Sequence, residues 1–324
     1  MTSADDSGTQ PVQIVVVGAA SRDIAPDDPR GWRLGGGVAY GALTTARLGL
    51  RTAALIGLDD QAADAHELEL LRRAGVEVRA YRLERGPVFE NIEQPAGRLQ
   101  IVHSASDELP PEALPGSWAG AVAWILAPVA AELPDSWSSR PTASAVVALG
   151  WQGLLRSLTA GEAVRHIPPA PSAVLTRADL VGVSRDDLDP AVELSRLCRL
   201  LHPGATLAIT QGRAGGVVIE TGPAGADGPV RMRHYPAAAS GPVIDPTGAG
   251  DVFLAALAAS RAVPRLVGGR LDKGLDLLLA ASAASLVLER QGLHGVPDRA
   301  AVRLRMARSL AGGRSSGATE PVSP

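Results

Sequence analysis

The sequence contains few lysine, cysteine and aromatic residues. Among 31 lysine and arginine residues in a chain of 324, Lys273 is the only lysine, and Cys198 is the only cysteine. One cysteine excludes an internal disulfide framework, and the Leu-Cys-Arg-Leu context of Cys198 indicates a buried helical thiol. Aromatic residues make up 3% of the chain, too few for a base-stacking platform. We expect the four tryptophans from Trp118 to Trp151 to pack in the core or in a lid.

Charge and hydropathy exclude further classes of partner. The net charge of -3, the pI near 6.1 and the scattered arginines provide no basic surface for nucleic acid. The polar N-terminus lacks the apolar segment of a secretion signal, and no apolar run reaches membrane-spanning length. We therefore expect a cytoplasmic protein with no nucleic-acid or membrane partner. Residues 1–11 and 312–324 are rich in Gly, Ser and Pro and are expected to be disordered tails.

Between these tails, short β-branched runs alternate with longer helical patterns, which predicts one α/β domain over residues 12–311. Its mainly parallel sheet would be sandwiched by helices, because parallel strands need crossovers and both faces need covering. The expected strands are Gln13–Val17, Thr52–Ile56, Val76–Tyr81, Val122–Ile125, Ala145–Leu149, Leu180–Val183, Thr206–Thr210 and Val217–Glu220. The expected helices are Val38–Leu48, Ala62–Ala74, Leu188–Leu201, Val252–Ala259 and Leu275–Leu288.

One interval interrupts this alternation. Residues 78–103 read as short strands separated by turn residues, with charged positions throughout. This pattern is typical of a small, partly exposed β layer. We predict a β lid formed by segments within about 32–36 and 78–103.

Several familiar chemical devices are missing. No G-x-x-x-x-G-K-[ST] loop is present, and no G-x-G-x-x-G opens the first helix after the first strand. With one lysine, a mechanism that needs a phosphate-binding or Schiff-base lysine would depend on Lys273. The six histidines show no paired spacing for a metal, and no G-x-S-x-G elbow of a serine hydrolase occurs.

The segment VIDPTGAGDVFLAAL, residues 243–257, offers a phosphate site that needs no lysine. Pro246 would end a strand that carries Val243 and Ile244, and a buried helix would follow. The amides of Gly248, Ala249, Gly250 and Asp251 would then lie at a helix N-terminus, free to bind an anion. Beside them, the carboxylate of Asp251 could accept a proton from a hydroxyl group that attacks a bound phosphoryl group. The alternative is that Thr247 or Asp251 only caps the helix.

DPTGAGD resembles the signature of the PfkB carbohydrate kinases, the ribokinase-like ATP-dependent sugar and nucleoside kinases. Other segments resemble this family in the same order: VVVGAASRD, GGGVAYGALTTARLGL and TQGRAGGVVI, within a resemblance from about Ile14 to Val302. The resemblance implies a ribokinase-like fold, ATP as cofactor and Asp251 as base. It also implies that substrate hydroxyls contact Asp23, Gly35 and Gly36, and that the nucleotide contacts Thr210, Gly212, Gly215, Asp245 and Thr247.

Two positions depart from the family pattern. Tyr40 stands where the family's G-G-x-x-x-N motif has asparagine, which suggests an acceptor bound differently from ribose or fructose. The N-x-x-E motif, linked to magnesium, corresponds to residues 184–187, so that Ser184 loses the amide and Asp187 keeps a shorter carboxylate. Asp187 could meet Mg²⁺ through water, with Asp186 as the alternative carboxylate.

The segments around Tyr40, GRLQIV and ALGWQGLLR also resemble a PfkB branch that includes plant myo-inositol kinases. This resemblance suggests a polyol or cyclitol whose hydroxyls would contact Asp23, Gln100 and Gln152. The alternative for both glutamines is an exposed polar position.

The predicted protein is therefore an ATP-dependent kinase that phosphorylates an alcohol of a small sugar, polyol, cyclitol or nucleoside. Two alternatives stay open: a non-catalytic nucleotide-binding regulator of kinase ancestry, and a hydroxymethylpyrimidine or pyridoxal kinase. A monovalent-cation requirement and a homodimer formed through the lid also stay open.

Overall fold

The computed structural model describes residues 10–94, 97–225, 228, 230–268 and 274–315. A nine-stranded sheet forms the centre of the molecule, in the spatial order β15-β14-β13-β12-β9-β8-β1-β4-β5. All neighbouring strands are parallel except the pairs β13–β14 and β14–β15, which are antiparallel. The strands are β1 (Ile14–Ala19), β4 (Thr52–Leu58), β5 (Glu77–Arg82), β8 (Ala123–Leu126), β9 (Val146–Gly150), β12 (Leu180–Ser184), β13 (Thr206–Thr210), β14 (Gly216–Glu220) and β15 (Arg231–Tyr235).

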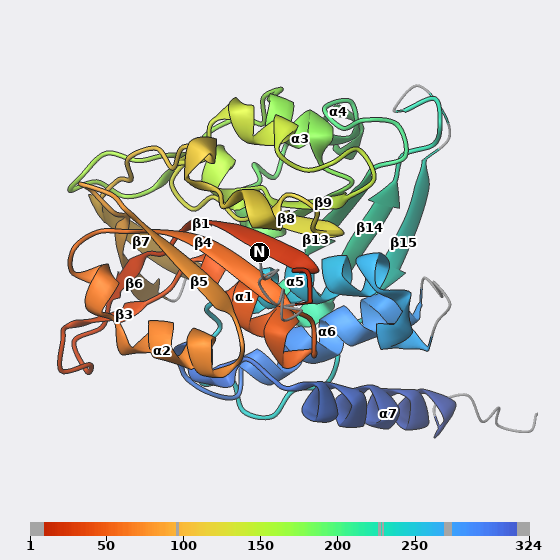
Figure 1. Ribbon diagram of the computed structural model, residues 1–324. Helices are drawn as coiled ribbons and strands as arrows, with labels where there is room; N and C mark the ends of the chain where they lie inside the picture. Colours follow the sequence, from red (N-terminus) through yellow and green to blue (C-terminus); the bar gives the residue numbers. More distant parts are fainter. Residues whose placement is uncertain (1–9, 95–96, 226–227, 229, 269–273, 316–324) are drawn as a thin grey trace, which may run out of the picture.

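Helices cover both faces of this sheet, which makes the predicted three-layer α/β sandwich (Figure 1). One face carries α1 (Gly37–Arg47), α2 (His66–Arg73), α5 (Ala249–Ala262), α6 (Leu275–Val287) and α7 (Arg299–Ser315); the other carries α3 (Ala173–Arg177) and α4 (Leu194–Cys198). Short 3₁₀ turns connect the elements: η1 (Ala62–Asp64), η2 (Pro111–Ala113), η3 (Gly116–Trp118), η4 (Asp135–Ser139), η5 (Gln152–Leu155), η6 (Arg185–Asp187), η7 (Gly212–Ala214), η8 (Pro264–Val267) and η9 (Gly292–Gly295).

The two helical layers enclose two separate apolar cores. On the α3 and α4 side, Trp118, Trp124, Trp137 and Trp151 are at most 1% exposed, and the Cys198 thiol is buried among them and their neighbours. Both predictions for these residues are confirmed. The second core joins α1, α5 and α6 to the sheet, largely through alanine and leucine. Small side chains let α1 and α5 pack closely against the sheet and against each other.

A four-stranded sheet of order β3-β2-β6-β7 projects beside the main sheet as the lid. It consists of β2 (Arg22–Ile24), β3 (Trp32–Leu34), β6 (Val88–Gln94) and β7 (Gly97–Ser104). The predicted lid interval is therefore too long at its start, because residues 77–82 form β5 of the main sheet. A two-stranded ribbon, β10 (Arg156–Ser157) and β11 (Arg165–His166), lies outside both sheets.

Three other local predictions are wrong. Val243 and Ile244 lie in no strand, and their side chains are 42% and 63% exposed. The helix expected over residues 188–201 shrinks to α4, because Pro190 disfavours helical backbone before it and Asp189 instead closes a turn onto Ala191. The C-terminal tail expected to be disordered from residue 312 is helical up to Ser315, because α7 extends that far; residues 1–9 and 316–324 of the two predicted tails lie outside the described residues. Strand β15 and helix α7 were not predicted.

Candidate active site

The predicted site residues gather at one edge of the main sheet. Because β1, β9, β12 and β13 run parallel, their carboxyl ends meet at the same edge, where α/β sheets bind ligands. The segments that follow these four strands carry Asp23, Gln152, Asp187 and Gly212, and the N-terminus of α5 brings Asp251 to the same carboxylate cluster.

The turn at the start of α5 has the geometry of an anion site. Gly248 is the N-cap residue, with a left-handed φ of 78°, and its carbonyl accepts the first helical hydrogen bond from Val252 at 2.9 Å. No side chain caps the helix, so capping by Thr247 or Asp251 is not what this turn provides. The amides of Gly250 and Asp251 lie in the first helical turn, where no intrahelical acceptor is available.

Two carboxylates lie against the Gly35–Gly37 backbone. A methyl group on Gly35 would lie 2.3 Å from an Asp23 oxygen, and one on Gly37 would lie 2.6 Å from Oδ1 of Asp251. Asp23 also accepts a hydrogen bond from Ser21 Oγ at 2.9 Å. The glycines at 35 and 37 therefore leave room for the carboxylate of Asp23, which is predicted to bind the substrate, and for that of Asp251, the predicted base.

The environment of Asp251 suits a base that works near neutral pH. Burial raises its pKa from 3.8 to about 7; the Arg156 guanidinium opposes this shift, and the charges of Asp187 and Asp23 add to it. A carboxylate with a pKa near the working pH accepts a proton more effectively than an ordinary aspartate.

A second polar cluster joins the segments after β9 and β12. The Gln152 amide donates to both oxygens of Asp187, at 3.0 and 3.1 Å, and Arg156 Nη2 donates to Oδ1 at 3.3 Å. Asp187 is 6% exposed, and these two donors hold its carboxylate in place. The sequence reasoning missed Arg156, whose only signal is a lone arginine directly after the apolar pair Leu154 and Leu155.

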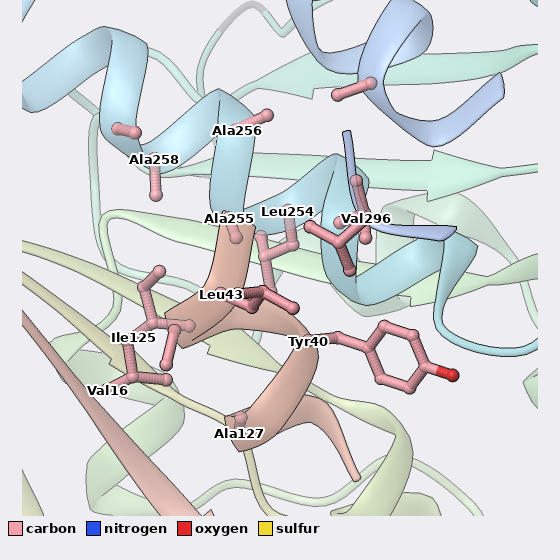
Figure 2. Close-up of a cluster of buried hydrophobic side chains, with 14 of the residues drawn as sticks. Val16, Tyr40, Leu43, Ile125, Ala127, Leu254, Ala255, Ala256, Ala258 and Val296 are labelled. Atoms are coloured by element: carbon pink, nitrogen blue, oxygen red, sulfur yellow. The ribbon is translucent and has the colours of Figure 1, made fainter. Parts of the chain in front are cut away.

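Tyr40 forms part of the wall of the anion site. Its ring is so close to Gly248 that a methyl group there would lie 2.4 Å from ring carbons. The ring extends away from Leu43 and the buried alanines of α5, with its hydroxyl pointing out of the cluster (Figure 2). Burial raises the pKa of this phenol, and Asp245, Asp23 and Asp251 raise it further, which places the hydroxyl in the field of three carboxylates.

The remaining predicted residues lie in the turn before Gly248, in the loop after β13 and in the lid. Asp245 accepts hydrogen bonds from the amides of Thr247 and Gly292, both at 2.9 Å, and so fixes the turn before Gly248. Thr210 ends β13, and the turn after it carries two left-handed glycines, Gly212 and Gly215. Gln100, by contrast, donates to Asn91 within the lid at 2.8 Å.

Within the described residues, no three or more His, Cys, Asp or Glu side chains are grouped so that they could hold a metal ion. No helix in the described part of the chain combines the length and apolar character needed to cross a membrane.

Comparisons with known proteins agree with this geometry. Residues 160–299 match the model of the pfkB family carbohydrate kinases. This range includes Asp187 and the turn at Asp251. No match was found among the curated proteins.

Solved structures share the fold over nearly the whole chain. A pyrophosphate-dependent kinase in the ribokinase family, solved with a pyrophosphate analogue and myo-inositol, is 21% identical with a TM-score of 0.66, covering 90% of this chain and 100% of that one. Arabidopsis thaliana ribokinase with ribose and ATP is 19% identical, with a TM-score of 0.62 and coverage of 92% and 99%. A putative ribokinase II from E. coli with ATP and Mg²⁺ is 16% identical, with a TM-score of 0.63 and the same coverage.

These likenesses establish the ribokinase-like fold predicted from the sequence. Together with the family match over residues 160–299, they confirm the predicted resemblance to the PfkB carbohydrate kinases.

Proposed function

We propose that the protein transfers the γ-phosphoryl group of ATP to a hydroxyl group of a polyol or cyclitol. The observation that carries this proposal is the position of the Asp251 carboxylate, in the first turn of α5 and against the backbone of Gly37. A base and an anion site are thereby combined in one helix turn, and phosphoryl transfer to an alcohol uses both.

In the proposed reaction, the amides of Gly248–Asp251 bind the γ-phosphoryl group. The acceptor oxygen attacks phosphorus as its proton moves to Asp251, and a new O–P bond forms. The bond between the γ-phosphorus and the bridging oxygen breaks, and ADP leaves with the electron pair. Closure of the lid over the acceptor would exclude water, which would otherwise be phosphorylated instead.

The acceptor site would be formed by Asp23, Gly35, Gly36 and Tyr40. A carboxylate and a phenol can each bind alcohol groups, and Tyr40 narrows the space beside Gly248. The structural neighbour solved with myo-inositol supports a cyclitol as the first candidate. Gln152 would act indirectly, because its amide nitrogen is already bound to Asp187, and Gln100 would depend on lid movement to reach the acceptor.

The donor site supports ATP, with inorganic pyrophosphate as a second candidate. Val243 and Ile244 expose apolar side chains just before the anion turn, and such a surface suits a purine. The loop with Thr210, Gly212 and Gly215 lies at the same sheet edge, where it would contact the nucleotide. The pyrophosphate-dependent neighbour is the observation that favours the second donor.

Magnesium fits this site as an ion carried by the donor phosphates. Both oxygens of Asp187 already accept hydrogen bonds, so this residue would contact Mg²⁺ through water. The ion would neutralise phosphate charge, while the protein groups position the donor and accept the proton.

The test is a panel of cyclitols, hexoses, pentoses, nucleosides and vitamin alcohols, each with ATP or pyrophosphate and Mg²⁺. We expect acceptor-dependent ADP release with a polyol or cyclitol. Pyridoxal or hydroxymethylpyrimidine as the best acceptor would identify the other kinase type. Nucleotide binding without transfer to any acceptor would favour the regulatory alternative, to which the departures at Tyr40 and Ser184 point.

A further inference from the structure

Arg156 is a buried cation with unused hydrogen-bonding capacity. Its side chain is 9% exposed, and its contact with Asp187 joins Nη2 to Oδ1 at 3.3 Å, longer than a strong charge-assisted hydrogen bond. Its Nε atom is buried and has no hydrogen-bond partner. An unpaired buried donor is costly, so a ligand that accepts from Nε would complete the site.

Arg156 supplies positive charge next to the proposed base, because its guanidinium acts on the Asp251 carboxylate. Burial lowers the pKa of its guanidinium, whereas Asp187, Asp251 and Asp23 raise it. The charges of three carboxylates therefore act on one cation, and a phosphate donor would bring several more negative charges for this cation to offset. The chain has a single lysine, Lys273, which lies outside the described residues. Lysine therefore supplies no cation in the described part of this site.

We propose that Arg156 binds the non-bridging oxygens of the phosphoryl group while it passes from donor to acceptor. This inference rests on the proposed function and adds a side chain to the transfer step. A guanidinium presents its donors in a planar fork that matches phosphate oxygens, which an ammonium group does not. Asp187, itself fixed by Gln152, holds this fork, and the charge of Asp251 acts on it.

The test separates phosphoryl binding from simple pairing with Asp187. Arg156→Lys keeps a positive charge for Asp187 but removes the fork, so a pairing role would survive this change. We expect kcat to fall roughly hundredfold or more, as for arginines that stabilise phosphoryl transfer, with the acceptor KM changed by about twofold or less. Guanidinium chloride at non-denaturing concentrations should restore part of the activity of Arg156→Ala.

Arg261→Gln is the matched control. Arg261 is also a poorly exposed arginine paired with a buried carboxylate, Asp276, but it lies at the other end of α5. Its replacement should leave kcat within about twofold, because it contacts neither donor nor acceptor in the proposed site.

A second measurement does not depend on finding the acceptor. Inorganic pyrophosphate should raise the melting temperature of the wild-type protein, and Arg156→Gln should lose most of this shift while Arg261→Gln keeps it. An active wild type whose Arg156→Lys variant keeps full kcat would overturn the role of Arg156 and leave the kinase proposal intact. If no acceptor is phosphorylated, the kinase proposal fails; equal pyrophosphate shifts in wild type and Arg156→Gln would then overturn this inference independently.

Discussion

The carboxylate of Asp251 and the backbone of Gly37 are in direct contact. A single methyl group on Gly37 would lie 2.6 Å from Oδ1 of Asp251 and 3.1 Å from Cβ of Ala127. The helices α1 and α5 therefore meet at their N-termini, and the carboxylate of Asp251, the proposed base, lies where they meet.

Gly37→Ala should reduce turnover far more than it changes substrate binding. The added methyl group must displace the Asp251 carboxylate, and a misplacement of about 1 Å can cost about a hundredfold in rate. Steady-state kinetics on purified protein would check this expectation. Gly120→Ala is the control, because a methyl group there meets nothing within 4 Å; equal losses in both variants would contradict the steric explanation.

The rate should depend on the ionisation of Asp251. Its pKa is about 7, and only the ionised form accepts a proton. In the free enzyme, log(kcat/KM) should therefore rise with a slope of one below pH 7 and level off above it. A profile that is flat from pH 5 to pH 8, with the stability of the protein verified over that range, would contradict the assignment of the base.

The same shift has a consequence for stability. The folded-state pKa lies above the ordinary value of 3.8, so the unfolded chain ionises first as pH rises. Wild-type stability relative to Asp251→Asn should fall between about pH 4 and pH 7 and stay constant above. In urea unfolding at pH 5 and pH 8, the free energy of unfolding of Asp251→Asn relative to wild type should be higher at pH 8. A relative free energy of unfolding of Asp251→Asn that falls as pH rises would contradict this expectation.

Tyr40 should control the acceptor rather than the donor. Loss of one hydroxyl contact is worth about 1 kcal/mol, so Tyr40→Phe should raise the acceptor KM by about fivefold and leave the donor KM unchanged. Tyr40→Asn should also shift the acceptor preference, because the space beside Gly248 opens. Identical acceptor profiles in all three proteins would show that Tyr40 only supports the turn at Gly248.

Glu132 should stabilise the junction between the end of β1 and the loop after β8. It is 1% exposed and accepts hydrogen bonds from the amides of Ala19 and Ala130, both at 2.8 Å, and of Val129 at 3.0 Å. Glu132→Gln would turn an amide group toward these donors and should cost about 2–4 kcal/mol of unfolding free energy. Glu112→Gln, on a side chain that is 75% exposed, should change stability by about 0.5 kcal/mol or less. Equal effects of the two substitutions would contradict this role.

The main sheet could be predicted because its strands are short runs that contain β-branched residues and are bounded by turn residues. Eight of its nine strands were expected from such runs, whereas β15, Arg-Met-Arg-His-Tyr, is an exposed edge strand with no apolar run to reveal it. Helix α7 was missed for a related reason, since its Ala- and Arg-rich sequence has little apolar periodicity. The apolar pair Val243 and Ile244 read as a strand because its exposure depends on tertiary structure.

The candidate site could be predicted only where it is encoded in consecutive residues. The turn at Gly248–Asp251 is such a segment, and its backbone conformation follows from its glycines. Arg156 and Glu132 could not be found in this way, because their importance comes from burial and from partners 31 and up to 113 residues away. Neither residue forms a motif with its neighbours in the chain.

The central claim is phosphoryl transfer with Asp251 as the base, and the most direct measurement compares wild type with Asp251→Asn. With the best acceptor, ATP and Mg²⁺ at pH 8, we expect acceptor-dependent ADP release by the wild type. Asp251→Asn should bind ATP normally and release ADP roughly a hundredfold to ten-thousandfold more slowly, the usual range for losing a general base. Turnover within about threefold of wild type would contradict the account.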